Sequence, residues 1–285
     1  MTRAGLMRLG VWILILLAWE GAYRLVKWDR TLFPAPSQVL DGALELLNIR
    51  TGFGNDFGPN WPKALDGGFG RAGDPIYRGA LITASLTSLI RLGVGFAISI
   101  VLGGILGAAM WRIRGLDEFL GPLFLGFQTL PSVCWVPLSI LVFGLRETGV
   151  LFVLVMGSFF AIALALRDGL RTIPPAYQNA GRMLGARGWK LYRYVLLPAS
   201  LPAVAASLRQ GFSFAWRSLM GAELLFAVQN HGLGFQLEMA RNNIDVAQVI
   251  AVMSIMVMLG IAADRLVFAR LERRVLVRFG LMAAG

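Results

Sequence analysis

The chain has 285 residues, of which 56% are hydrophobic and only 15% are charged, and its mean hydropathy is +0.66. This composition excludes disordered and ordinary water-soluble proteins and predicts an all-α protein that crosses a membrane several times. The formal net charge of +11 would suit nucleic-acid binding. However, Lys and Arg gather at the ends of apolar runs, so we expect a lipid membrane and no nucleic acid as partner. One cysteine and one histidine exclude a disulfide framework, a thiolate cluster and a His-rich metal site.

Six apolar stretches are long enough to span a bilayer, which takes about 20 residues per helix. Their approximate bounds are 6–25, 83–111, 119–143, 149–166, 201–228 and 246–268. The third stretch contains Pro131 and Pro137, so we expect it to be kinked or broken. The first stretch follows Arg3 and Arg8 as in a signal peptide. No small-residue cleavage site follows cleanly, so we expect it to remain as the first transmembrane helix.

The distribution of Lys and Arg predicts the orientation. With the N-terminus inside, cytoplasmic segments hold fourteen of the 27 basic residues, whereas the short outer loops hold only Arg146 and Arg241. The positive-inside rule therefore places both termini in the cytoplasm. We expect three regions: an N-terminal transmembrane helix (1–30), an extracytoplasmic loop region (31–79) and a five-helix core (80–285).

A basic segment at about residues 175–190, between the fourth and fifth apolar stretches, is predicted to be a short cytoplasmic helix. Pro175 suits a helix start, and Gly185 suits the residue after a helix end. A second helix should begin at Trp189 and be interrupted by Pro198 and Pro202. One interpretation is a helix that lies on anionic lipid headgroups, and the other is a docking element for a cytoplasmic partner.

The same segment resembles the EAA loop of ABC-importer permeases. In that family the loop reads Glu-Ala-Ala, three residues, Gly, nine residues and Ile-x-Leu-Pro. Here Ala180, Gly185 and "VLLP" up to Pro198 keep the spacing, whereas Asn179 and Gly181 depart from it. The segments "LFPAPSQVL", "TASLTSLIRLGVGF", "LPSVCWVPLSILVFGL" and "GAELLFAVQNHGLGF" are similar, in order, to further segments of the nitrate/sulfonate/taurine branch.

The resemblance implies a type I importer permease in the bacterial inner membrane, paired with a second copy or a close paralogue. P-loop ATPase subunits would bind ATP and Mg, and an extracytoplasmic binding protein would deliver a small anion. Nitrate or bicarbonate is favoured, with taurine or an alkyl sulfonate as alternatives. The chain has no GxxxxGK[ST] motif and no cofactor of its own is expected, so it would be a non-catalytic subunit. The residues implied to contact the ATPase are Ala176, Asn179, Ala180, Met183, Leu184, Gly185, Ala186, Leu197 and Pro198.

Ionisable residues at membrane depth are costly and usually face protein or water. Arg91 lies in the second stretch, and Arg209, Arg217 and Glu223 lie in the fifth. A polar and aromatic stripe on the fifth helix, together with three residues beside Pro131, forms our candidate translocation path or gate. Its members are Gln128, Thr129, Trp135, Arg209, Ser213, Trp216, Met220 and Glu223. The alternatives are interhelical pairing for Glu223 and a structural kink at Pro131.

Two other functions remain open. A stand-alone, ion-coupled secondary transporter would need a midplane ion site, and the sequence shows no internal repeat of the kind such folds contain. A membrane-embedded enzyme would need convergent His, Asp or Cys residues, and one His with one Cys argues against it.

Overall fold

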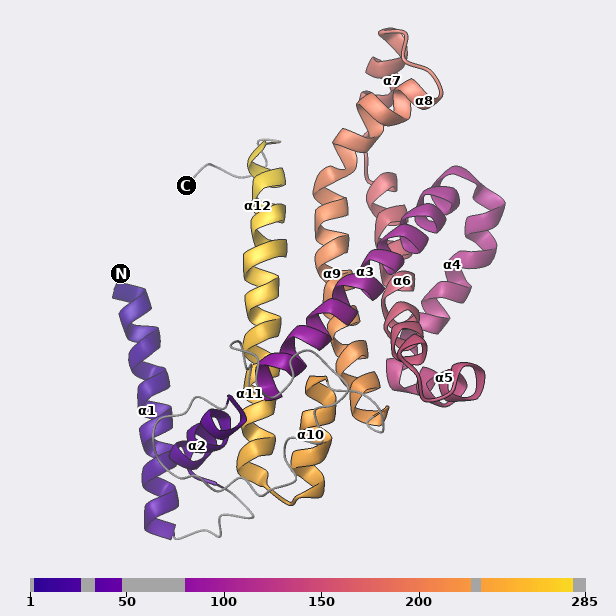
Figure 1. The fold of residues 1–285 in the computed structure, drawn as a ribbon. Helices are drawn as coiled ribbons and strands as arrows, with labels where there is room; N and C mark the ends of the chain where they lie inside the picture. Colours follow the sequence, from indigo (N-terminus) through magenta and orange to yellow (C-terminus); the bar gives the residue numbers. More distant parts are fainter. Residues whose placement is uncertain (1–2, 27–33, 48–79, 227–231, 279–285) are drawn as a thin grey trace, which may run out of the picture. The chain divides into compact units, whose positions relative to one another are not determined.

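The computed structural model describes residues 3–26, 34–47, 80–226 and 232–278, and these ranges contain helices and no β-strand (Figure 1). The predicted all-α class is confirmed. The chain separates into two compact units. Unit 1 comprises residues 1–88 and 230–258, and unit 2 comprises residues 89–229 and 259–285. Helices α3 (Ala80–Arg112) and α11 (Val246–Ala263) contribute residues to both.

Unit 1 contains α1 (Arg3–Val26), α2 (Pro36–Leu47), α10 (Leu233–Asn242), the start of α3 and most of α11. Polar contacts join α1 to α2: the backbone N–H of Ser37 donates to the Glu20 carboxylate at 3.3 Å, and Gln38 donates to the Tyr23 hydroxyl at 3.1 Å. The backbone N–H of Leu233 donates to Ser88 Oγ at 2.9 Å, which ties α10 to α3.

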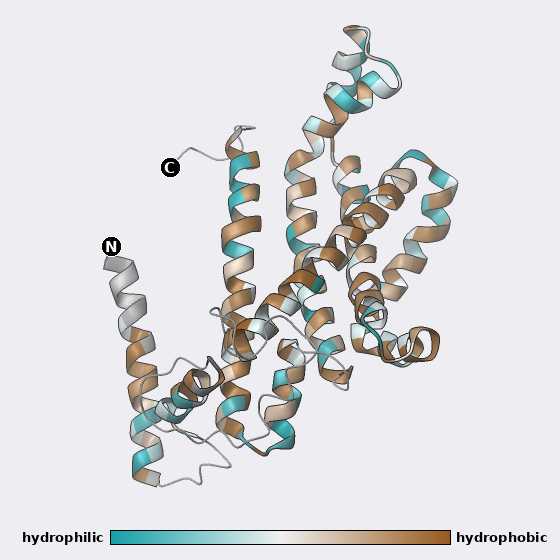
Figure 2. Cartoon of the chain, in the orientation of Figure 1, coloured by the Kyte–Doolittle hydropathy of each residue, from teal (hydrophilic) through white to brown (hydrophobic). Residues whose placement is uncertain are grey.

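Helix α1 covers the predicted first span. Its 24 residues extend about 36 Å at 1.5 Å per residue, enough to cross a hydrocarbon core of about 30 Å. Val11 and the five apolar residues from Ile13 to Leu17 are exposed, and the middle of this helix is strongly hydrophobic in Figure 2. Exposed apolar side chains on successive turns suit a lipid environment.

Four helical segments of the described residues are long and apolar enough to cross a membrane: Leu81–Arg112, Glu147–Arg171, Trp189–Leu225 and Val246–Val277. A fifth span results if α4 (Arg114–Thr129) and the helical segment Ser132–Phe143 are counted together. The polytopic character is therefore confirmed. The total of six stays a prediction that depends on α1.

The predicted break in the third span is confirmed at Pro131. Helix α4 ends at Thr129, a short 3₁₀ turn η2 (Ser132–Cys134) follows, and α5 (Trp135–Phe143) continues at 96° to α4. Pro131 has no backbone N–H, and the residue before a proline is driven out of the helical region. Leu130 accordingly adopts an extended conformation, with ψ 129°. Pro137 lies inside α5 without ending it.

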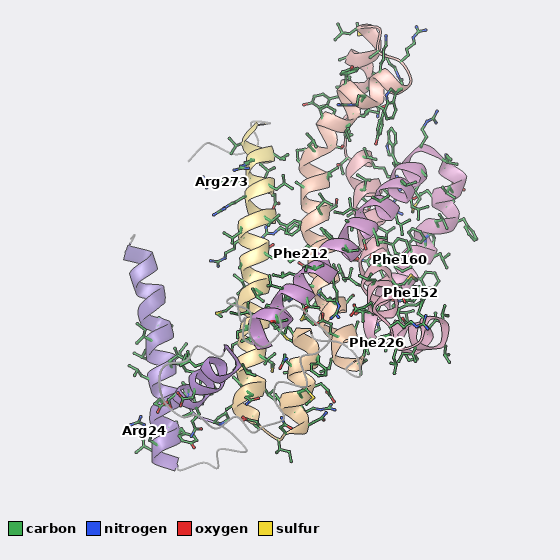
Figure 3. The ribbon with its side chains drawn as sticks, in the orientation of Figure 1. Arg24, Phe152, Phe160, Phe212, Phe226 and Arg273 are labelled. Atoms are coloured by element: carbon green, nitrogen blue, oxygen red, sulfur yellow. The ribbon has the colours of Figure 1, made fainter. Side chains whose placement is uncertain are left out.

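The core of unit 2 is built on α6 (Glu147–Arg171) and α9 (Leu197–Leu225), which pack along one another. Buried apolar residues from α3, α5, α6 and α9 form its main cluster, including Phe96, Val153, Phe212, Leu219 and Phe226. Figure 3 marks Phe212 on α9, Phe226 directly after its end, and Phe152 and Phe160 on α6. A second cluster joins α4 to α6 through Phe124, Phe160 and Met110 of α3.

Glycines of α3 set its distance from α6. A Cβ at Gly103 would lie 2.8 Å from the Phe159 carbonyl oxygen, and one at Gly107 would lie 2.6 Å from the Ala163 carbonyl oxygen. These distances show that both glycines permit close helix packing. Gly93 and Gly104 of the same helix have nothing within 4 Å of the Cβ position, so they do not set this distance.

Gly107→Leu is expected to destabilise the chain by about 1–3 kcal/mol, because the new side chain would collide with backbone that cannot rotate away. Gly104→Leu is the matched control, since it lies on the same helix with nothing within 4 Å. Thermal unfolding of the detergent-purified variants, followed by circular dichroism, measures the difference. Equal melting temperatures for the two variants would contradict the packing role of Gly107.

The predicted interruption at Pro198 and Pro202 is wrong. The chain is continuously helical from Trp189 to Leu225, through α8 (Trp189–Leu191), a π-helical turn η3 (Tyr192–Leu196) and α9. Leu197 donates its N–H to the carbonyl of Tyr192, five residues back. This wider turn directly precedes Pro198, and the helical run continues through Pro198 and Pro202 without ending at either.

A second π-helical turn, η4 (Asp264–Phe268), joins α11 to α12 (Ala269–Arg278). Residues 27–33, 48–79 and 227–231 lie outside the described residues, and with them most of the predicted extracytoplasmic loop region and the end of the predicted fifth span. The three-region division predicted from the sequence stays a prediction.

Candidate functional site

The basic segment forms α7 (Pro175–Met183), a helix that begins with a proline in its first turn, as predicted. Its end is a Schellman motif: Ala186 donates its N–H to the Gly181 carbonyl at 2.9 Å, and Gly185 donates to the Arg182 carbonyl at 3.0 Å. Gly185 has φ +83°, a conformation in which a side chain would be strained. The predicted helix end at Gly185 is therefore confirmed.

Helix α7 presents apolar side chains to its surroundings. Met183 is 89% exposed and Leu184 is 87% exposed, and Tyr177 is also exposed. The predicted contact residues Ala176, Asn179, Ala180 and Gly185 are exposed with them. An exposed apolar tip on a short connection between two long helices suits a protein partner, because such patches are costly in water.

The opposite side of α7 is held against the start of the long helix. Gly181 is buried, and a Cβ there would lie 2.7 Å from Leu191 Cδ1 and 3.0 Å from Val195 Cγ2. This contact gives a physical reason for glycine where the EAA pattern has alanine. Ala186 packs on the apolar cluster formed by Leu170, Ile173, Leu191 and Leu196.

The predicted coupling residues thus fall into two groups. Six lie exposed on α7 and its end, whereas Ala186, just after α7, and Leu197 and Pro198, at the start of α9, are half-buried. The first group is accessible to a partner, and Ala186 packs on the apolar cluster that holds α7 in place.

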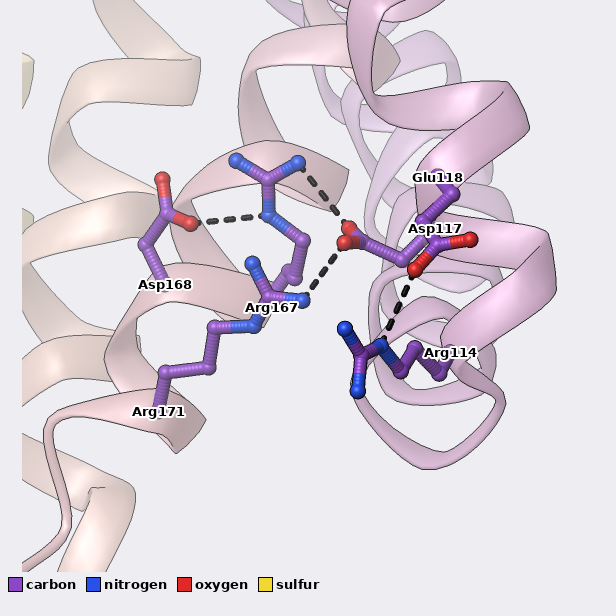
Figure 4. Close-up of polar contacts among 6 residues, drawn as sticks. All are labelled: Arg114, Asp117, Glu118, Arg167, Asp168 and Arg171. Atoms are coloured by element: carbon purple, nitrogen blue, oxygen red, sulfur yellow. Dashed lines mark hydrogen bonds and ion pairs between the residues drawn. The ribbon is translucent and has the colours of Figure 1, made fainter.

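An ionic cluster joins the end of α6, from which α7 continues, to the start of α4 (Figure 4). Asp117 of α4 accepts from Arg167 at 3.1 Å and from Arg171 at 2.5 Å, and Arg167 also donates to Asp168 at 2.8 Å. Beside it lies a cavity of about 640 Å³, which Asp117, Arg167 and Gln210 help to line. The cluster gives the region near α7 a fixed link to the broken third span.

The helix break at Pro131 borders a second cavity, of about 270 Å³. Gln128 and Thr129, both predicted path residues, line it together with Ser132, Arg217 and Ser218. Trp135, predicted with them, is half-buried and packs on Phe127 and Phe160 (ring centroids 5.7 and 6.4 Å), so its ring belongs to an aromatic cluster.

The residues of the predicted stripe on α9 have three kinds of surroundings: ion pairs with carboxylates, the apolar core, and the exposed surface. Arg209 donates to Asp264 at 2.7 and 2.8 Å and to Glu272 at 2.9 Å. Trp216 and Met220 pack on the main apolar cluster, and Ser213 is exposed. The guanidinium of Arg209 is thus already engaged by two carboxylates.

Glu223 is fully buried and accepts from Arg91 Nη1 at 2.9 Å. Arg91, itself 7% exposed, also pairs with Glu147 at the start of α6. The arrangement corresponds to the interhelical alternative weighed from the sequence, because it joins α3, α6 and α9. A role of Glu223 as a path residue stays a prediction.

Sequence reasoning missed two features of this region. The partners of Arg91 are 56 and 132 residues away in the chain, so no local pattern indicates them. Arg217 lines the cavity at the helix break, and its spacing of four residues from Ser213 is the signal that was available. Both features depend on which helices meet, which periodicity alone does not define.

Comparisons with known proteins identify the fold and its relatives. Residues 99–277 match the family model of the binding-protein-dependent transport system inner membrane component. The chain is 25% identical over 253 residues to the nitrate import permease protein NrtB of Synechocystis, with 89% of this chain and 83% of NrtB covered. It is 29% identical to the bicarbonate transport system permease protein CmpB of Synechococcus elongatus, with 69% and 70% covered.

Among solved structures, the inward-facing MetNI methionine ABC transporter superposes with a TM-score of 0.58 at 19% identity, covering 69% of this chain and 96% of that chain. This likeness supports the permease fold, and the expected nitrate/sulfonate branch agrees with the named relatives. An ABC importer permease is a non-catalytic transport component, so that prediction is confirmed as well. The chain belongs to the binding-protein-dependent transport system inner membrane component family, and it is an ABC importer permease.

Proposed function

We propose that the chain is the translocating subunit of an ATP-driven importer for a small anion, with nitrate or bicarbonate favoured and taurine or an alkyl sulfonate as the next candidates. An extracytoplasmic binding protein would deliver the anion, and two permease copies, identical or paralogous, would enclose the path. Both termini would lie in the cytoplasm of a bacterial cell. The names of the relatives NrtB and CmpB support this choice of substrate.

The observation that carries the coupling part of the proposal is the exposed apolar tip of α7. Met183 and Leu184 lie where a partner can reach them, and the chain has no P-loop motif of its own. A permease driven by ATP therefore needs a separate ATPase. P-loop ATPase subunits that bind ATP and Mg are the partners of this tip.

The connections of α7 offer a route for coupling. α7 follows α6 after three residues and leads through α8 and η3 into α9. Because α6 and α9 are the central helices of unit 2, a displacement of α7 would move both, and the Asp117 cluster would carry the movement to α4. ATP binding would close the ATPases and open the path outward.

Reconstitution of the permease with its ATPase and binding protein into liposomes tests the proposal. We expect ATP-dependent uptake of nitrate or bicarbonate that stops when the binding protein is omitted. Uptake driven by an ion gradient without ATP would contradict it. ATP-dependent uptake of taurine or an alkyl sulfonate alone would retain the mechanism and correct the substrate.

A further inference from the structure

Arginines at membrane depth differ in their partners. Arg91 pairs with Glu147 and Glu223, and Arg209 pairs with Asp264 and Glu272. Within the described residues, Arg217 of α9 forms no ion pair with a carboxylate. Its Nε donates to the Ser213 carbonyl at 3.1 Å, and its guanidinium carbon lies 4.9 Å from the centroid of the Phe214 ring.

These two contacts hold the guanidinium and leave its terminal N–H groups for another ligand. The side chain of Arg217 is exposed and lines the cavity of about 270 Å³ at the break of the third span. A water molecule takes about 30 Å³ in the liquid, so this volume holds a small oxyanion with part of its hydration shell.

The rest of the cavity wall also suits an anion. No carboxylate lies among its described lining residues, and the polar members are one amide and three hydroxyls, of which the Thr129 hydroxyl already donates to the Gly126 carbonyl at 2.6 Å. These members are Gln128, Thr129, Ser132 and Ser218.

We propose that Arg217, with Gln128, forms an anion-binding site in the permease itself, with a small oxyanion as its ligand. A guanidinium presents two parallel N–H donors, which match two oxygens of a planar nitrate or bicarbonate or of a sulfonate. The inference rests on the proposed function, because it assigns a contact to the anion that the importer carries. The anion contact on α9 is thereby assigned to Arg217 and not to Arg209, which the sequence placed in the candidate translocation path.

The close approach of α6 and α9 fixes this cavity. A Cβ at Gly157 of α6 would lie 1.8 Å from Ser218 Oγ, so only glycine permits the two helices to meet at the cavity wall. Arg217 is the neighbour of Ser218 on α9. The position of Arg217 is therefore fixed by the contact between α6 and α9, and not by a loop.

The test uses the full complex in liposomes and compares wild type with Arg217→Gln, Arg217→Lys and Arg114→Gln. Arg114 is a matched control, since its side chain is 92% exposed on α4 and pairs only with nearby Glu118 among the contacts described. Nitrate, bicarbonate and methanesulfonate are the probes, and complex assembly and basal ATPase activity are measured alongside.

We expect Arg217→Gln to lower uptake of the transported anion at least tenfold at low anion concentration, with assembly of the complex unchanged. Arg217→Lys keeps the charge but loses the paired N–H donors, so its uptake should fall below that of wild type and no lower than that of Arg217→Gln, and Arg114→Gln should match wild type. Uptake by Arg217→Gln within twofold of wild type would overturn the site, and so would an equal loss of uptake in Arg114→Gln. If the wild-type complex carries none of the three anions, the proposed substrate class fails and the site fails with it.

Discussion

Replacing Met183 and Leu184 together with Asp is expected to abolish copurification of the ATPase and to reduce ATP-dependent uptake to background. Both side chains are almost fully exposed, so the double substitution removes an apolar contact and places two charges against the partner without disturbing the core. Removing central apolar contacts from an interface costs several kcal/mol, and about 1.4 kcal/mol lowers affinity tenfold. Affinity purification in mild detergent, followed by quantification of the ATPase, measures the effect.

The matched control for this variant is Ile244→Asp. Ile244 is also an exposed apolar residue, 73% exposed, but it follows α10 and not α7. Its φ of 58° suits Asp better than a β-branched residue, so the control should fold well. Full ATPase recovery with the Met183 and Leu184 variant would contradict the docking role of the α7 tip. A lipid-surface role for α7 would then replace it.

Glu223→Gln is expected to destabilise the permease by roughly 3 kcal/mol, because it leaves the Arg91 guanidinium largely buried with one carboxylate removed. Glu223 is 0% exposed and its carboxylate lies 2.9 Å from Arg91. The resulting loss of stability would lower the thermal unfolding temperature of the purified chain in detergent.

Glu147→Gln is the control for the buried pair. Glu147 also pairs with Arg91, but its side chain is 56% exposed, so water replaces much of the lost interaction. We expect it to cost under about 1 kcal/mol. If Glu223→Gln keeps its unfolding temperature but loses transport, Glu223 acts in the translocation path and interhelical pairing is not its main role.

Local features of this fold could be predicted from the sequence. The helix end at Gly185 and the break at Pro131 depend on backbone properties of glycine and proline, which act within a few residues. The apolar stretches predicted the helices that cross the membrane because a run of about 20 apolar residues is also a local feature of the sequence. Pro198 and Pro202 were misjudged because a proline removes one backbone hydrogen bond, and the run from Trp189 to Leu225 stays helical without it, with a π-helical turn just before Pro198.

Features that depend on tertiary contacts could not be predicted. Gly104 and Gly107 look alike in the sequence, and only the position of α6 shows that Gly107 is the one in contact. Ion pairs could not be predicted either. Arg209 and Arg217 both lie on α9, but within the described residues only Arg209 pairs with carboxylates of the C-terminal helical segments. The helix α10 was missed because it is short and lies beside a segment rich in polar residues.

The central claim is that the chain acts as the permease of an ATP-driven importer. Purification of the tagged chain from its native membrane in mild detergent, with identification of the bound proteins and their stoichiometry, tests it most directly. The account predicts a P-loop ATPase at one copy per permease copy. A monomer or homo-oligomer with no ATPase, even after crosslinking, would contradict it.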